Sequence, residues 1–176
     1  MKSNIALIGF MGTGKTAVGR ALAKRLGKKF IELDLLIEQR ARKSIPDIFQ
    51  KDGEIAFREL EIEAAKKVAR DTDAVIACGG GIVLNKINID RLRESSRIIY
   101  LTASPGAILK RTSRRKNERP LLDVPDPAKR IRELLEFRKP FYERAADITI
   151  NTSQLDINAV AEQIIEKLKE DESFYY

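Results

Sequence analysis

Short apolar segments alternate with longer amphipathic segments along this chain. The short segments predict β-strands, at residues 5–8, 30–34, 74–78, 97–101 and 147–150. The longer segments predict helices. The first ends near Leu26, and the others cover residues 35–42, 53–69, 87–94, 105–112, 127–145 and 157–170. In the last of these, apolar residues including Ile157, Ile164 and Leu168 recur at helical spacing, which predicts a helix with one buried face.

This order of elements predicts the fold class. Apolar strands separated by helices are typical of a mostly parallel sheet that is covered on both faces. We therefore expect one α/β domain over residues 1–176, a doubly wound five-stranded sheet. Ser44 is expected to cap a short turn through Ile48 and Phe49. Ligands of such sheets bind beyond the carboxyl ends of the strands, and polar clusters follow the first three strands there.

Composition excludes several kinds of chemistry. The 176 residues contain no histidine, which excludes imidazole catalysis and histidine-ligated metals. The single cysteine, Cys78, cannot form an internal disulfide, and no CxxC pair is present to bind zinc. A lone thiol favours a reducing, cytoplasmic location. No apolar segment has the length of a signal peptide or a membrane span, so we expect no membrane partner.

The charge balance is basic, with 33 Lys and Arg against 26 Asp and Glu. Much of the excess lies in residues 110–119, which carry six cations and one acid. This segment can be a lid that closes over a nucleotide, a solvated run of charge or an RNA contact. No aromatic residue for base stacking lies nearby, which weighs against single-stranded nucleic acid.

The most specific local signal follows the first strand. Residues 9–16 match GxxxxGK[ST], with an apolar strand before them and a helix after them. Glycines let successive N–H groups point inward around a phosphate, Lys15 supplies a cation and the Thr16 hydroxyl ligates Mg²⁺. The motif predicts a nucleotide-phosphate loop. The chain lacks the apolar strand ending in DExx that helicases have and the NKxD motif of GTPases, which argues against both classes. Its small size favours a kinase that acts on a small molecule.

Three further features permit both a functional and an ordinary interpretation. Asp34, at the end of the second predicted strand, can accept the proton of a substrate hydroxyl or cap a helix. Arg58, with Glu61 at i+3, can bind a carboxylate or lie on a charged helix surface. The glycines at 79–81 can let a ligand approach the backbone or form a loose turn.

Taken together, these motifs resemble the shikimate kinase family. The resemblance rests on residues 9–16, Asp34, Gly53-Glu54 with Phe57-Arg58, residues 79–81, Arg119-Pro120-Leu121-Leu122, and Arg138 with Pro140 and Tyr142, in the order of the family. It implies a P-loop kinase fold with a mobile lid at about 112–125 and an acceptor-binding helical segment at about 35–62. It also implies transfer of the γ-phosphoryl of ATP to the 3-hydroxyl of shikimate with Mg²⁺, by a monomer.

The resemblance implies roles for individual residues. Catalysis would involve Lys15, Asp34 and Arg119. ATP would be bound by Gly12, Thr13, Gly14, Lys15, Thr16, Ala17, Arg111, Arg119 and Gln154. Shikimate would be bound by Asp34, Arg58, Gly79, Gly80, Gly81 and Arg138. The metal would be held by Thr16 and, through water, by Glu32.

The chain departs from the family pattern at three places. Position 32 is Glu where the family usually has Asp, Ala77 replaces a polar residue of many such kinases, and the basic segment is one residue longer than expected. The alternatives are a kinase for gluconate or a nucleoside monophosphate, a nucleotide-binding module without catalysis, and an RNA-binding protein.

Overall fold

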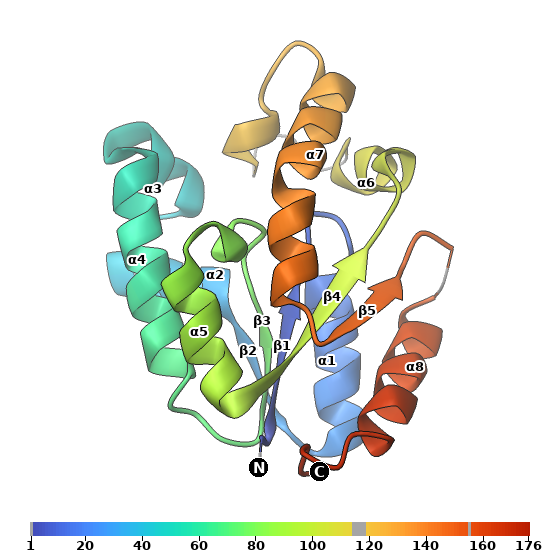
Figure 1. Ribbon diagram of the computed structural model, residues 1–176. Helices are drawn as coiled ribbons and strands as arrows, with labels where there is room; N and C mark the ends of the chain where they lie inside the picture. The colour runs from blue at the N-terminus through green and yellow to red at the C-terminus, as the bar shows by residue number, and fades with distance from the viewer. Residues whose placement is uncertain (1, 114–118, 155) are drawn as a thin grey trace.

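The computed structural model describes residues 2–113, 119–154 and 156–176. Its centre is a five-stranded sheet in the order β2-β3-β1-β4-β5 (Figure 1). The strands are β1 (Asn4–Ile8), β2 (Lys29–Glu32), β3 (Ala74–Ala77), β4 (Ser96–Thr102) and β5 (Ile148–Asn151). Every neighbouring pair is parallel. The predicted α/β class and all five predicted strands are therefore confirmed.

Helical segments connect these strands in the predicted alternation. They are α1 (Lys15–Leu26), α2 (Leu33–Ala41), α3 (Ile45–Lys51), α4 (Gly53–Val68), η1 (Ile82–Leu84), α5 (Lys86–Ser95), α6 (Pro105–Thr112), η3 (Pro120–Leu122), α7 (Pro127–Ala145) and α8 (Ile157–Lys169). Most ends lie within a few residues of the prediction. The pattern does not predict the 3₁₀ turns η1 and η3, because three residues carry no periodic pattern.

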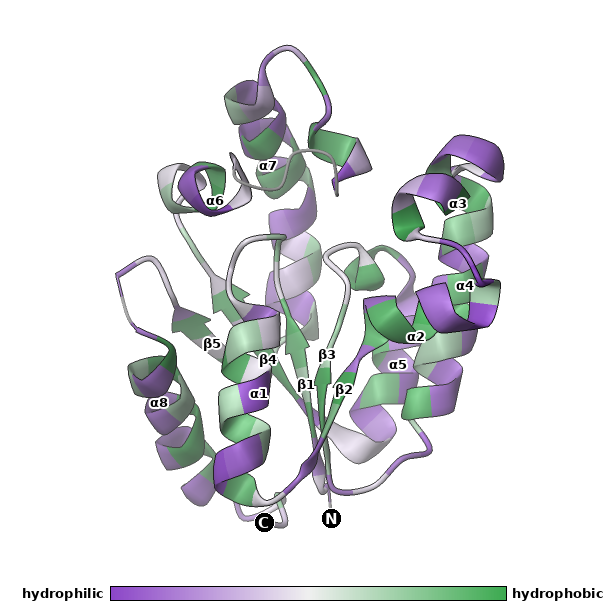
Figure 2. Ribbon diagram, turned by 180° about the vertical axis from the view of Figure 1, so that it is seen from behind, coloured by the Kyte–Doolittle hydropathy of each residue, from purple (hydrophilic) through white to green (hydrophobic). Residues whose placement is uncertain are grey.

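The core consists of two apolar layers, one on each face of the sheet. Successive residues of β1 alternate between them: Ile5 and Leu7 pack with α1 and α8, whereas Ala6 and Ile8 pack with helices that include α4, α5 and α7. All five residues of β1 are buried. Figure 2 shows largely apolar strands between helices that carry both apolar and polar residues. Burial on both faces explains why the strands are uniformly apolar.

The end of the second strand differs from the prediction. β2 ends at Glu32, and Asp34 lies in the first turn of α2 instead of at a strand end. A carboxylate in the first turn interacts favourably with the helix dipole. Asp34 is not the N-cap, because that position is Glu32, which makes no side-chain capping bond. Ser44 does cap the next helix as predicted, accepting a hydrogen bond from Asp47 N at 3.2 Å.

Helix α7 has the bounds that the sequence predicts, although Pro140 lies inside it. Its buried positions are Ile131, Arg138, Tyr142 and Ala145. These residues recur at helical spacing, so one face of α7 brings a cation and a hydroxyl into the interior. Among the described residues, no helix has the length and apolar content needed to cross a membrane.

Candidate functional site

The loop between β1 and α1 has the shape of an anion-binding nest. Gly9, Gly12 and Gly14 have φ of 146°, 77° and 95°, where side chains are rarely tolerated. A Cβ on Gly9 would also overlap the Leu101 carbonyl oxygen. The loop opens onto the N-terminus of α1, where unpaired N–H groups and the helix dipole favour a phosphate.

Thr13 contributes to this loop in a different way from its neighbours. Its side chain is buried and its hydroxyl donates to Phe10 O at 2.8 Å. Its carbonyl oxygen accepts from the Thr152 hydroxyl at 2.8 Å. Thr13 therefore holds the loop in shape through these two bonds, and its side chain does not line the adjoining cleft.

Lys15 is held against the loop that precedes it. Its ammonium donates to Gly9 O at 2.8 Å and to Phe10 O at 2.9 Å. Burial lowers the pKa of Lys15 to about 8, while the carboxylate of Asp34 acts in the opposite direction. At neutral pH the side chain still carries its charge, placed where the loop would hold a phosphate.

Thr16 and Glu32 form the oxygen pair that could hold a metal ion. The Thr16 hydroxyl donates to Glu32 Oε1 at 2.9 Å, and Arg20 lies 3.4 Å from the other carboxylate oxygen. Within the described ranges, no group of three His, Cys, Asp or Glu residues is placed to bind a metal. One hydroxyl and one carboxylate fit Mg²⁺, which usually keeps several waters and is completed by substrate phosphates.

The glycine turn after β3 lies where buried charged side chains converge. A Cβ on Gly79 would lie 2.9 Å from Asp34 Oδ1 and 3.1 Å from Glu61 Oε2. A Cβ on Gly81 would overlap the Arg58 guanidinium, with Cζ at 2.6 Å. The glycines thus make room for the protein's own carboxylates and guanidinium, a reason that the sequence did not reveal.

Arg58 is oriented by two acids on its own helix. Its guanidinium donates to Glu61 at 3.0 Å and to Glu54 at 3.1 Å, so the contact expected at i+3 is present. The Glu61 side chain is fully buried. Burial raises the pKa of Glu61, and Arg58 counteracts this rise. Glu61 Oε2 has no hydrogen-bond partner within the described part of the chain.

Arg138 reaches the same turn from α7. It is 3% exposed, and its guanidinium carbon lies 5.8 Å from the centre of the Phe10 ring. A Cβ on Gly80 would be 3.6 Å from one of its terminal nitrogens. Its Nε has no hydrogen-bond partner among residues 2–113, 119–154 and 156–176. Arg58 and Arg138 therefore flank the glycine turn from two different helices.

Asp34 lies between the phosphate loop and this turn. Burial raises the pKa of Asp34 and the Lys15 ammonium opposes the shift. Its Oδ1 is buried and accepts no hydrogen bond in the described residues. A buried carboxylate oxygen without a partner is uncommon and is suited to accept a bond from a ligand.

These groups line one cleft with two connected compartments. The larger, of about 970 Å³, is lined by Gly12, Gly14, Lys15, Thr16, Ala17, Glu32, Asp34, Gly79, Gly80, Arg111 and Arg119, among others. The smaller, of about 120 Å³, is lined by Arg58, Arg138 and residues 79–81. Asp34 and Arg119 line both. The fold thus brings most predicted site residues together.

The smaller compartment has an apolar wall whose residues the sequence did not assign individually, although three of them lie in the predicted acceptor-binding segment 35–62 and the fourth in the predicted lid. It consists of Ile45, Phe49, Phe57 and Leu121. The rings of Phe49 and Phe57 lie 4.8 Å apart. In the sequence these residues follow ordinary core patterns, so no local signal distinguishes a residue that faces a ligand from one that faces another helix.

Arg111 is fixed at the other end of the cleft. Its guanidinium donates to Gly12 O at 3.1 Å and to Thr152 O at 2.6 Å. With Ser153 it lines a further recess of about 400 Å³. Gln154, which was predicted beside the nucleotide, is exposed and lines neither the cleft nor this recess. Residues 114–118 of the predicted lid lie outside the described residues.

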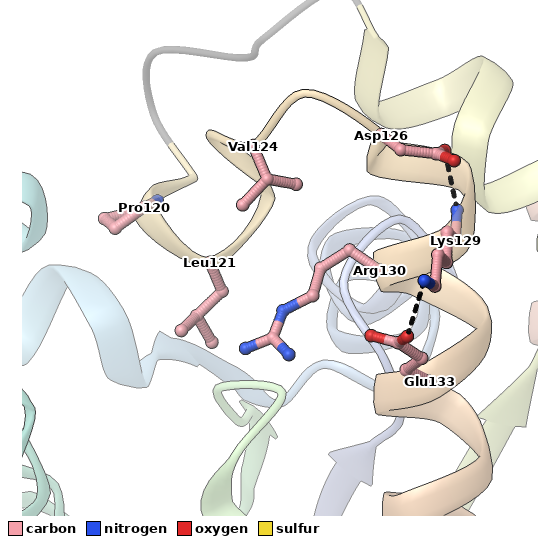
Figure 3. Close-up of a pocket in the computed structure, with 7 residues that line it drawn as sticks. All are labelled: Pro120, Leu121, Val124, Asp126, Lys129, Arg130 and Glu133. Atoms are coloured by element: carbon pink, nitrogen blue, oxygen red, sulfur yellow. Dashed lines mark hydrogen bonds and ion pairs between the residues drawn. The ribbon is translucent and has the colours of Figure 1, made fainter.

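A separate recess of about 360 Å³ lies between η3 and the start of α7 (Figure 3). Arg130 points into it beside Leu121, and the Lys129–Glu133 ion pair lies along its edge at 3.9 Å. None of the predicted site residues lines this recess. Pro120 and Leu121 form one side of this recess, and the same two residues also line the smaller compartment of the cleft.

Comparisons with known proteins identify the family of this chain. The family model for shikimate kinase matches residues 11–169. The shikimate kinase of Caldanaerobacter subterraneus subsp. tengcongensis is 53% identical over 162 residues, covering 92% of this chain and 94% of the relative. That of Thermoanaerobacter pseudethanolicus is 48% identical, with the same coverage of 92% and 94%.

A solved structure is similar over nearly the whole chain. It is the shikimate kinase from Acinetobacter baumannii in complex with shikimate, with a TM-score of 0.94 and 37% identity. The match covers 98% of this chain and 96% of that protein.

Replacing Gly81 with alanine tests the steric role of the glycine turn. We expect Gly81→Ala to displace the Arg58 guanidinium from Glu61 and to destabilise the protein by about 2–4 kcal/mol, because it leaves a buried carboxylate unpaired. Urea unfolding measures the loss. Gly106→Ala is the matched control, since nothing lies within 4 Å of its Cβ and it lies in a helix. Equal stability of the two variants would contradict the steric role.

Proposed function

Since this chain belongs to the shikimate kinase family, we propose that its cleft binds ATP and shikimate side by side and transfers the γ-phosphoryl of ATP to the 3-hydroxyl of shikimate. The chain is an ATP-dependent kinase whose acceptor is a hydroxyl of shikimate.

The observation that carries the assignment is the pair of guanidinium groups around the glycine turn. Arg58 comes from α4 and Arg138 from α7, and both line the smaller compartment. A planar guanidinium binds a carboxylate through two parallel hydrogen bonds. We assign the carboxylate of shikimate to this position, with the N–H groups of residues 79–81 as further donors. The apolar wall of Phe49, Phe57 and Leu121 would contact the carbon ring.

Asp34 would hold the reacting hydroxyl. It lines both compartments, so a hydroxyl bound to it faces the phosphate loop. Its raised pKa makes it a stronger base than an ordinary aspartate, and its partnerless oxygen can accept the hydroxyl proton. The protein need do little covalent chemistry in phosphoryl transfer, where positioning and charge neutralisation dominate.

The phosphates would be held by the loop of residues 9–16, by Lys15 and by Arg119. N–H groups of the loop would contact the β-phosphate, whereas Lys15 and Arg119 would neutralise charge on the transferred group. Thr16 and Glu32 fit Mg²⁺ as oxygen ligands, Glu32 through water. When bound, Mg²⁺ would neutralise charge on the phosphates.

The adenine would lie against Arg111, which its bonds to Gly12 and Thr152 hold at the end of the cleft. The predicted lid at 112–125, of which residues 114–118 lie outside the described residues, would close over the nucleotide. We propose that the protein works as a monomer.

A panel of acceptors tests the proposed function. We expect ADP release, followed in a coupled assay, with shikimate and ATP, and none with gluconate or AMP, because only shikimate places a ring carboxylate between two arginines. Lys15→Ala should lower turnover by about 100-fold or more, since it removes a charge that stabilises the transferred phosphoryl group. Turnover of gluconate or AMP without shikimate turnover would disprove the assignment.

Arg138→Met tests carboxylate binding. It keeps the apolar stem and removes the charge, so we expect the KM for shikimate to rise about 10- to 100-fold, the effect of losing about 1.5–3 kcal/mol of hydrogen bonding to a charged group. The KM for ATP should stay unchanged. Arg144→Met is the control, because Arg144 is exposed on the same helix. An unchanged shikimate KM in the Arg138 variant would exclude this role.

Asp34→Asn separates catalysis from stability. We expect kcat to fall by about 10²- to 10⁴-fold, because the amide cannot accept a proton. Burial raises the folded-state pKa of Asp34, so the folded protein binds this proton more tightly than the unfolded chain, and ionisation reduces stability as pH rises through the raised pKa. The neutral amide should therefore leave Tm at pH 7 unchanged or higher.

The raised pKa of Asp34 also predicts how kcat/KM depends on pH. In the wild type, kcat/KM should decrease as pH falls through the raised pKa of Asp34, at a higher pH than an ordinary aspartate would give. This acidic limb should be absent from the residual activity of Asp34→Asn. Near-normal kcat in the variant would remove Asp34 from the reaction.

A further inference from the structure

Tyr142 is the one phenol that reaches the glycine turn in the described part of the chain. It lies on α7, is fully buried, and its hydroxyl donates to the carbonyl oxygen of Gly80. Its ring is stacked on Tyr100 of β4, with centroids 4.9 Å apart and planes 18° apart. The side chain is therefore fixed by the sheet on one side and ends on the turn that lines the smaller compartment.

A bond to this carbonyl fixes more than one atom. In a trans peptide the C=O of Gly80 and the N–H of Gly81 point in opposite directions, so holding one directs the other. The N–H groups of Gly79, Gly80 and Gly81 donate no hydrogen bond in residues 2–113, 119–154 and 156–176. Glycine has the widest conformational freedom, so this peptide would otherwise rotate readily.

Arg138, the arginine proposed to bind the acceptor, lies on the same helix as Tyr142. Arg138 precedes Tyr142 by one helical turn on α7, so both side chains lie on one face. Burial raises the pKa of Tyr142, and the charge of Arg138 opposes the shift. The hydroxyl is therefore bonded to Gly80 on the turn that Arg138 also approaches, so it lies where the two sides of the proposed carboxylate site meet.

Gly80 in turn lies against the phosphate loop. A Cβ built on it would be 3.4 Å from Met11 N and 3.6 Å from Gly9 O. The turn is therefore confined by the phosphate loop on one side and by α7 on the other. A rotation of the Gly80 peptide would move donors of the acceptor compartment without changing the phosphate loop itself.

We propose that Tyr142 is a positioning residue for the acceptor, which holds the Gly80 peptide and Arg138 in one arrangement through its hydroxyl. The inference rests on the proposed function, because it assumes that the acceptor carboxylate binds between Arg138 and the glycine turn. It assigns Tyr142 no contact with the acceptor and no part in proton transfer.

Tyr142→Phe tests the proposal, since it keeps the ring and its stacking and removes only the hydroxyl. We expect the KM and the calorimetric Kd for shikimate to rise about tenfold. The Kd for a non-hydrolysable ATP analogue and kcat at saturating shikimate should stay within about twofold of the wild type. Tyr100→Phe is the matched control, because it removes a hydroxyl from the stacked partner, which does not contact the turn.

A double variant distinguishes positioning from simple stabilisation. If the hydroxyl acts through Arg138 and Gly80, the effects of Tyr142→Phe and Arg138→Met on the shikimate Kd should combine to less than their product. If the hydroxyl only stabilises the fold, Tyr142→Phe should lower Tm and leave the shikimate Kd unchanged.

Three results would overturn the proposal: an unchanged shikimate Kd, an equal loss of ATP-analogue affinity, or failure of Tyr142→Phe to fold at any assay temperature. The last would make the hydroxyl a requirement of folding instead of acceptor binding. Wild-type protein is assayed in parallel. If the wild type does not phosphorylate shikimate, the proposed function fails, whereas wild-type turnover with an unchanged variant Kd refutes only the role of Tyr142.

Discussion

The backbone after β3 must pass between buried charged groups, and the arrangement of the cleft depends on that constraint. Side chains from α2 and α4 occupy the space where a Cβ of Gly79 or Gly81 would lie. The chain can therefore bring Asp34, Glu61 and Arg58 against one short turn only because the turn has no side chains of its own. A ligand that enters this space meets charged groups and peptide N–H donors within a single small compartment.

Burying these charges together has an energetic cost that the cluster offsets internally. Isolated buried ions are strongly unfavourable, but here acids and cations alternate: Glu61 pairs with Arg58, and Asp34 lies near Lys15. The compensation is incomplete, because Asp34 Oδ1, Glu61 Oε2 and Arg138 Nε lack hydrogen-bond partners in the described residues. Such groups are where a protein gives up stability in order to bind a ligand.

The fold and the phosphate loop could be predicted from sequence because their signals are local. Strands buried on both faces are uniformly apolar. Residues 9–16 have the glycine and lysine spacing of a phosphate loop, and they lie between an apolar strand and a helix. The sequence predicts Asp34 at a strand end, whereas the structure places it in α2. The residue before it, Leu33, is apolar, and an apolar residue fits the last position of a strand as well as the first position of a helix. The positions of Gln154, which is exposed, and of Tyr142, which is buried against the glycine turn, could not be predicted from sequence. Whether a side chain faces the cleft depends on contacts between segments far apart in sequence, which no local pattern records.

The strand order explains why one cleft can hold both substrates. After β1 the chain crosses toward β2, and after β4 it crosses toward β5, so the direction of winding reverses between the neighbouring strands β1 and β4. A crevice forms at such a reversal because the two connections diverge. The phosphate loop leaves β1 at this crevice, and the glycine turn leaves the adjacent strand β3. Since β1 and β3 are hydrogen-bonded neighbours, Gly80 lies beside Met11 as a consequence of the register, and the acceptor compartment therefore adjoins the phosphate loop.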